Sequence, residues 1–321
     1  MKTTRFLSLL TVTALLASPA QAVTFTIGYQ KGGLPALLKA RGTLDAVKAQ
    51  GIDFTWTLFT AGPPLLEAAN AGAVDFGAVG DAPGVFALAG GADLKYVATS
   101  ETRVPTTEAI IVPAGSSLKT LANLKGKKIG VARGSSAHYF LYRALKSAGL
   151  TLDDVQLVPL LPPDARPAFE TGAIDAWAIW DPFLTTALQG SGARVLKDHS
   201  GLYLGKSFYL APSRVLADAQ KKKALQYLLD ALADTAAWAN THQREVIDEL
   251  HTDLGLPVSV LNVTVPKGLP YNIRPFLPSD TANLQGLADA FFEAGVLPKA
   301  VKLDATTYQT LPSFLAARVQ K

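Results

Sequence analysis

Short apolar runs alternate with longer stretches of helical periodicity along most of the chain. The run at 23–27 is followed by a turn and by a helical pattern from residue 34 to about residue 50, and a second run spans 54–59. A helix is expected over 64–71, before the apolar segment at 74–79. Because strands that alternate with helices form parallel sheets covered by those helices, the pattern predicts an α/β fold.

One segment of this pattern occurs twice. Gly-Ala-Val-Asp at 72–75 returns as Gly-Ala-Ile-Asp at 172–175, and Asp81 returns as Asp181. Upstream, 26–29 matches 128–131, and each copy leads into a turn, a helix, a strand-like segment and another helix. The alternative to a repeat is a chance match of small residues, but the order of the predicted elements agrees as well as the residue types. The repeat predicts two similar lobes, lobe 1 from 23–107 plus 206–321 and lobe 2 from 108–205.

Two extended stretches are expected to connect the lobes. The segment 106–113 is interpreted as the crossover and 207–211 as the return, and two crossings suit a hinge. The remainder, 217–321, has mainly helical spacing and is expected to pack on lobe 1. Its proline-rich section, 266–278, is expected to form a surface loop, with Tyr271 and Arg274 as candidate residues at the rim of a site.

The first 22 residues have the organisation of a secretory signal peptide. Lys2 and Arg5 precede an apolar run from Phe6 to Ala17, and Ala-Gln-Ala at 20–22 resembles a cleavage site. No later stretch approaches the roughly 20 apolar residues of a membrane span. Removal would leave 321 − 22 = 299 residues, enough for about two domains. We therefore expect an exported, periplasmic protein.

The charge and the residue types exclude several functions. Without Lys2 and Arg5, 28 basic and 26 acidic residues leave a net charge of +2, which does not favour nucleic acid. The chain has no Cys, which excludes thiolate nucleophiles, disulfides and a lipid-anchored cysteine, so no lipoprotein is expected. Its four His lack paired metal-ligand spacing, and neither a metal nor a cofactor is expected.

The turn Gly134-Ser135-Ser136-Ala137-His138 lies between an apolar strand-like run and a helical pattern. A turn that opens a helix leaves backbone N–H groups unpaired at the positive end of the helix dipole. Two hydroxyls and an imidazole add donors, so the turn could bind an anion. An ordinary serine N-cap on a surface helix is the simpler interpretation.

The repeat relates four loops, two in each lobe, at the carboxyl ends of predicted strands. Residues 30–33 correspond to 134–138, and 80–83 correspond to 180–182. In open α/β sheets ligands bind at this edge. If the lobes face each other, the four loops converge on one cleft.

Taken together, these motifs resemble the aliphatic sulfonate-binding proteins of ABC importers over nearly the whole mature chain. The motifs are Tyr29-Gln30-Lys31, Gly62-Pro63, Gly80-Asp81-Ala82-Pro83, Gly134-Ser135-Ser136-Ala137-His138, Asp164-Ala165-Arg166, Asp-Ala-Trp-Ala-Ile-Trp-Asp-Pro at 175–182 and Ser207-Phe208-Tyr209-Leu210-Ala211. The resemblance implies a type II periplasmic binding protein, expected to be a monomer, that closes on an alkanesulfonate and delivers it to an ABC permease in the membrane.

The resemblance also implies which residues contact the ligand. These are Gln30, Gly80, Asp81, Thr107, Ser135, Ser136, Ala137, His138, Trp180 and Asp181. Relatives that bind taurine, nitrate or thiamine-pyrimidine precursors leave the ligand class open. Relatives often carry a bulkier residue at Gly32 and a proline at Gly84, and we expect both departures to open the wall of the site in lobe 1.

Each proposed contact has a simpler structural interpretation beside it. A sulfonate is permanently ionised, and the N–H groups of 136–138 suit its three oxygens. Asp81 and Asp181 begin helices, so either could cap backbone donors without contacting a ligand. Trp180 could pack on an alkyl tail or in the core, whereas Trp177 on the other face of the strand is expected in the core. Gln30 offers an amide, and Lys31 is expected to be solvated.

An enzyme on this fold is the competing class. Ser135 or Ser136 with His138 and Asp181 could form a triad, but residues two or three apart at a helix start rarely align a nucleophile with its base. No G-x-S-x-G motif is present, and the absence of Cys excludes a cysteine-dependent desulfinase of this fold. The sequence favours a binding protein.

Overall fold

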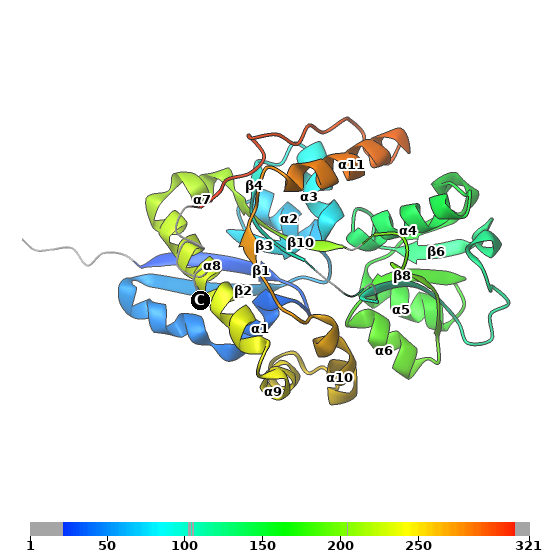
Figure 1. Ribbon diagram of the computed structural model, residues 1–321, viewed down its shortest axis with the longest axis horizontal. Helices are drawn as coiled ribbons and strands as arrows, with labels where there is room; N and C mark the ends of the chain where they lie inside the picture. Colours follow the sequence, from blue (N-terminus) through cyan, green and yellow to red (C-terminus); the bar gives the residue numbers. More distant parts are fainter. Residues whose placement is uncertain (1–21, 102–103, 105, 204, 312–321) are drawn as a thin grey trace, which may run out of the picture.

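The computed structural model describes residues 22–101, 104, 106–203 and 205–311 (Figure 1). The expected signal peptide therefore lies outside the described residues, apart from Ala22. Within the described part, no helix is long and apolar enough to cross a membrane.

Two separate sheets organise the chain, and Figure 1 shows them side by side. The first has the order β11-β4-β10-β3-β1-β2, with β1 Val23–Tyr29, β2 Ile52–Leu58, β3 Phe76–Val79, β4 Leu94–Glu101, β10 Lys206–Pro212 and β11 Arg274–Pro275. The second has the order β7-β6-β8-β5-β9, with β5 Glu108–Val112, β6 Lys128–Val131, β7 Gln156–Pro159, β8 Ala176–Trp180 and β9 Arg194–Asp198. We call the part built on the first sheet lobe 1 and the part built on the second lobe 2.

The two sheets repeat one strand order, as the internal repeat predicts. The series β2-β1-β3-β10-β4 in lobe 1 corresponds to β7-β6-β8-β5-β9 in lobe 2. The predicted parallel pairing is confirmed for β1 with β2 and β3, and it recurs for β6 with β7 and β8. In addition, β10 and β5 each run antiparallel to both neighbours. Each of these two strands is the first one formed after the chain has passed from the other sheet.

The two segments expected to connect the lobes lie mostly inside strands. Most of 106–113 is β5, and 207–211 lies inside β10. Both segments are apolar and buried, and they pair within a sheet instead of spanning the gap. The chain passes between the lobes after Glu101 and returns after Asp198.

Helices cover both faces of each sheet, which makes each lobe three layers thick (Figure 1). In lobe 1 they are α1 Leu34–Arg41, α2 Gly62–Asn70, α3 Asp81–Ala89, α7 Ser213–Ala217, α8 Ala219–Ala239, α9 Gln243–Leu254, α10 Val258–Lys267 and α11 Asp280–Glu293. In lobe 2 they are α4 Ser136–Ser147, α5 Pro162–Glu170 and α6 Phe183–Gly190. Short 3₁₀ segments are η1 Thr43–Gln50, η2 Leu121–Leu124 and η3 Leu152–Asp154.

Three helix boundaries differ from the sequence prediction. The single helix expected over 34–50 breaks at Gly42, whose φ of 63° is left-handed, and continues as η1. α2 begins at Gly62 because two prolines fit its first turn, where no N–H needs a partner. The expected loop at 266–278 starts later, since α10 extends to Lys267, and it contains β11.

The repeated aspartates have the same structural role in both lobes. Asp75 accepts the N–H of Thr26 through Oδ2 at 3.0 Å, and Asp175 accepts the N–H of Lys128 at 2.8 Å. In return, the N–H of each aspartate donates to the carbonyl of the same partner. The motif therefore fixes the start of one strand to its parallel neighbour, which is why it recurs.

Candidate functional site

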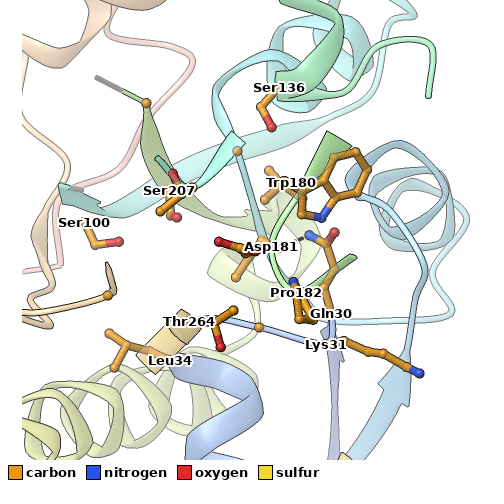
Figure 2. Close-up of a pocket in the computed structure, with 18 of the residues that line it drawn as sticks. Gln30, Lys31, Leu34, Ser100, Ser136, Trp180, Asp181, Pro182, Ser207 and Thr264 are labelled. Atoms are coloured by element: carbon orange, nitrogen blue, oxygen red, sulfur yellow. Dashed lines mark hydrogen bonds between the residues drawn. The ribbon is translucent and has the colours of Figure 1, made fainter. Parts of the chain in front are cut away.

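A cavity of about 270 Å³ lies between the two lobes. The first residues of helices from both lobes line it, as the four-loop prediction anticipates, and α2 adds a fifth helix start. These residues are Leu34 of α1, Gly62 of α2, Gly80 before α3, Ser135 and Ser136 of α4, and Pro182 and Phe183 of α6. Figure 2 shows Leu34, Ser136 and Pro182 around this space. Helix N-termini of both lobes thus face one cavity.

The turn before α4 supplies free backbone donors. Gly134 adopts a φ of 76°, which a side chain would disfavour. The Ser135 hydroxyl accepts the N–H of His138, so it caps the helix. The N–H groups of Ser136 and Ala137 find no acceptor among the described residues. The capping interpretation of the turn is confirmed, and two backbone donors at the helix start remain without an acceptor among the described residues.

The lobes contact each other closely at this turn. A Cβ placed on Gly80 would lie 2.7 Å from the Cβ of Ser136, and one on Gly134 would lie 3.1 Å from the ring of Phe86. On the same side, Tyr139 of α4 packs edge-on against Phe291 of α11 with ring centroids 5.4 Å apart. Only a residue without a side chain fits at position 80 in this arrangement.

Asp181 caps its helix and reaches the other lobe. Its Oδ1 accepts the N–H and the hydroxyl of Thr185, at 3.0 and 2.6 Å. Its Oδ2 lies 2.8 Å from the ammonium of Lys267, which also donates to the carbonyl of Thr106 at 3.0 Å. Asp181 therefore accepts a backbone donor at the start of its helix, as predicted, and its ion pair with lobe 1 is a contact that the sequence did not predict.

Asp81 is buried at the start of α3 and is not among the residues that line the cavity. Its Oδ1 accepts the N–H of Ala82 at 2.9 Å. Burial raises the pKa of Asp81 well above its ordinary value, and the charge of Glu108 adds to this effect. Asp81 therefore acts on backbone donors at its own helix start.

Sequence reasoning missed a buried polar group in lobe 2. Glu108 accepts the hydroxyl of Ser136 with one carboxylate oxygen, and its Oε2 lies 3.0 Å from Nε2 of His199. His199 is 2% exposed and lies between the rings of Phe140 and Tyr203. All three polar residues line the cavity. The position of Glu108 at the site could have been inferred only from the pairing of β5 with β8, which sets Glu108 opposite the predicted site residue Trp180.

Three further predicted residues line the cavity, namely Gln30, Thr107 and Trp180. The Gln30 amide donates to the carbonyl of Ala78 at 3.0 Å, which fixes its side chain. Trp180 is half-buried, whereas Trp177 is 1% exposed and packs in the core of lobe 2, as expected. Lys31 also lines the cavity, and it forms no ion pair within the part of the chain that the structure describes.

His138 and Ala137 are not among the lining residues. The imidazole of His138 is 2% exposed and packs between Phe86 and Phe291, so the expectation that it donates at this cavity is not supported. Its Nδ1 accepts the N–H of Gly134. Burial lowers the pKa of His138 to about 4, and the charge of Arg133 contributes.

The two glycines named as departures behave differently. A Cβ on Gly32 would lie 3.8 Å from the Asp181 carbonyl, so this residue does face the cavity wall. The expectation for Gly84 is wrong, since a Cβ there would lie 2.2 Å from the buried hydroxyl of Tyr96. Gly84 lets α3 approach β4 and does not widen the site.

One wall of the cavity is apolar and comes from α9, α10 and the loop that follows them. Its residues are Leu250, Leu256, Leu261, Val265 and Tyr271. Tyr271 is thus placed as expected, but Arg274 is not, because its guanidinium binds the carboxylates of Asp280 and Glu101 at 2.7–2.9 Å. The apolar wall suits a hydrocarbon group.

The serine-based triad is not assembled in this structure. Asp181 is engaged by Thr185 and Lys267, and His138 is not among the residues that line the cavity. Among the described residues, no group of three or more acidic or histidine side chains could hold a metal ion.

Solved structures share this arrangement. The alkanesulfonate-binding protein SsuA from Xanthomonas axonopodis pv. citri bound to MOPS is 36% identical, with a TM-score of 0.83 over 91% of this chain and 100% of that one. The periplasmic aliphatic sulphonate binding protein SsuA from Escherichia coli is 38% identical, with a TM-score of 0.77 over 89% and 92%. The fold is that of the two-lobed periplasmic binding proteins.

The sequence comparisons define the family. The profile of the NMT1/THI5 like family matches residues 48–246. A relative from Escherichia coli (strain K12), named for binding aliphatic sulfonates, is 39% identical over 298 residues, 92% of each chain. The chain therefore belongs to the NMT1/THI5-like family and is a homologue of the aliphatic sulfonate-binding proteins.

Proposed function

We propose that this protein binds an aliphatic sulfonate between its lobes and delivers it to the permease of an ABC importer. The observation that carries the proposal is the meeting of helix N-termini from both lobes at one cavity, where the N–H group of the lining residue Ser136 has no acceptor among the described residues. A sulfonate needs several donors from different directions and no proton transfer. Donors at helix starts meet that need without an arginine.

The charges around the cavity support an anion. Each carboxylate that lines it has a partner: Asp181 has Lys267, Glu108 has His199 and Ser136, and Glu101 has Lys206 and Arg274. The unpaired charged group among the described lining residues is the cation Lys31. An anion that enters therefore meets free donors and a free positive charge.

The apolar wall at α9 and α10 favours a hydrocarbon tail on the ligand. Leu250, Leu261 and Val265 border the cavity with aliphatic side chains, and Tyr271 borders it with a ring. Each methylene that leaves water for such a wall contributes about 0.8 kcal/mol. This favours alkanesulfonates over nitrate, which has no tail, and over taurine, whose ammonium would lose hydration there.

Isothermal titration tests the proposal. We expect ethanesulfonate to bind, octanesulfonate to bind more tightly, and nitrate and taurine to bind weakly or not at all. Micromolar affinity corresponds to about −8 kcal/mol. Absence of binding by every alkanesulfonate would contradict the proposal, and release of sulfite in the same mixtures would indicate an enzyme instead.

The cellular role completes the proposal. We expect export through the signal peptide at 1–22, a periplasmic location and action as a monomer. Cell fractionation and light scattering would check these points, and tight octanesulfonate binding would stand independently of them.

A further inference from the structure

A second cavity, of about 460 Å³, lies at a different junction of the two lobes. Lobe 2 contributes residues from β6, η3 and β7, and lobe 1 contributes Ala294, Gly295 and Val296 after α11. It shares no lining residue with the cavity between the helix starts. Most of its lining residues are apolar, among them Val131, Leu152 and Leu157.

His138, which lines this second cavity, has a buried donor without a partner. Its Nδ1 accepts the N–H of Gly134 at 3.2 Å, so the proton of the neutral ring is on Nε2. Nε2 has no hydrogen-bond partner among the described residues, although the residue is 2% exposed. A buried donor left unpaired costs about 1–3 kcal/mol. The residue borders the cavity, so an acceptor bound there recovers that cost once a small displacement of the wall uncovers Nε2.

Arg133 brings a positive charge to the same place. It lines the cavity with His138, its side chain is exposed, and it forms no hydrogen bond or ion pair within the described ranges. A guanidinium presents paired donors that match two oxygens of one carboxylate. Asp153 is the other charged lining residue and would repel an anion, so the anionic group belongs at the Arg133 and His138 end.

We propose that this cavity is a second ligand site, which binds a small organic carboxylate through Arg133 and the Nε2–H of His138. The carboxylate supplies the missing acceptor and pairs with the guanidinium, and the hydrocarbon part packs on the apolar residues. Because both lobes form the wall, a bound carboxylate contacts both and favours the arrangement in which they touch. The site does not depend on what the first cavity binds.

Nuclear magnetic resonance of the histidine rings tests this on the full chain. The probes are hexanoate, hexylammonium, which has the same hydrocarbon and the opposite charge, and inorganic phosphate. We expect hexanoate to shift the ring signals of His138, assigned by their loss in His138→Phe, and the other two probes to leave them unchanged. Shifts of equal size with hexylammonium would overturn the proposal. Equal affinity for phosphate would overturn the statement that the ligand is an organic carboxylate.

Arg133→Gln is the decisive variant, since the exposed side chain can change without loss of packing. We expect the Kd for hexanoate to rise at least about tenfold, which corresponds to about 1.4 kcal/mol. Lys128→Gln removes the same charge from an exposed residue of β6 that does not line the cavity, and it should leave the Kd unchanged. Equal affinity of Arg133→Gln and the unchanged chain would refute the assignment.

Discussion

The ammonium of Lys267 lies 2.8 Å from the carboxylate of Asp181, although the first ends α10 in lobe 1 and the second follows β8 in lobe 2. On the same face, the Gln189 amide of α6 donates to the backbone carbonyl of Ser259 in α10, and the Ser259 hydroxyl donates to Oε1 of Gln189. Figure 1 shows these two helices next to each other. The ion pair therefore joins the lobes and neutralises a carboxylate that lines the cavity.

Lys267→Met should weaken the binding of octanesulfonate about tenfold or more. Without the ammonium, the charge of Asp181 remains unpaired beside the anion, and repulsion grows as salt is removed. Titration calorimetry at low and high ionic strength measures both effects. Lys299→Met, at an exposed residue far along the chain after α11, is the matched control. Equal affinities of the two variants would contradict this role of Lys267.

Gly80→Ala should weaken sulfonate binding while leaving the fold stable. The backbone of Gly80 has a φ of −72°, which alanine adopts freely, but its Cβ would lie 2.7 Å from the Cβ of Ser136 in the other lobe. We expect a Kd at least about tenfold higher and an unchanged midpoint of thermal unfolding without ligand.

Gly115→Ala is the control for this prediction, because a Cβ there meets nothing within 4 Å. If Gly80→Ala binds as tightly as Gly115→Ala, the close approach of the lobes at Ser136 is not part of the bound state.

The stability of the protein should fall in weak acid because of His138. Its pKa of about 4 lies below the ordinary value of 6.5, so folding favours the neutral ring. The contribution is complete above about pH 6.5 and is lost as the pH falls toward 4, by about 3 kcal/mol in total. Denaturant unfolding of the unchanged chain and His138→Phe from pH 7.5 to 4.5 measures the difference. A difference that stays constant over this range would show that His138 does not titrate with unfolding.

The repeated aspartates provide an internal comparison. Asp75 binds Arg214 and Lys221 in addition to the N–H of Thr26. Within the part of the chain that the structure describes, Asp175 has only the backbone contact that repeats the one of Asp75. Burial acts to raise the pKa of Asp75, but these hydrogen bonds outweigh it and lower the pKa overall. Asp75→Ala should therefore cost about 3 kcal/mol of unfolding free energy and Asp175→Ala about 1. Equal losses would mean that Arg214 and Lys221 add nothing to the unfolding free energy through Asp75.

The repeat made the architecture predictable from the sequence. Gly-Ala-Val-Asp and its copy each fix two parallel strands to one another, so the repeated residues indicate the same local structure in both lobes. The antiparallel strands β5 and β10 were not predictable in this way. Both are apolar runs like the parallel ones, and their direction depends on how the chain enters each sheet.

The site was predictable where the backbone supplies the chemistry. Helix starts at Gly80, Ser136 and Pro182 follow from turn residues and strand ends, and all three line the cavity. The orientation of side chains was not predictable, since Gly84 and His138 face neighbours that are distant in sequence. Glu108 was not predicted as a site residue, because the neighbouring sequence does not show whether a carboxylate lies in the buried part of a strand or at its solvated end.

The free N–H groups at the start of α4 have an evolutionary consequence. Backbone donors persist under almost any substitution that keeps the helix in place, so recognition of the charged head is resistant to mutation. The apolar wall at α9 and α10 consists only of side chains and can change one residue at a time. Descendants of this chain could therefore acquire new cargo by altering that wall while retaining the same anionic group.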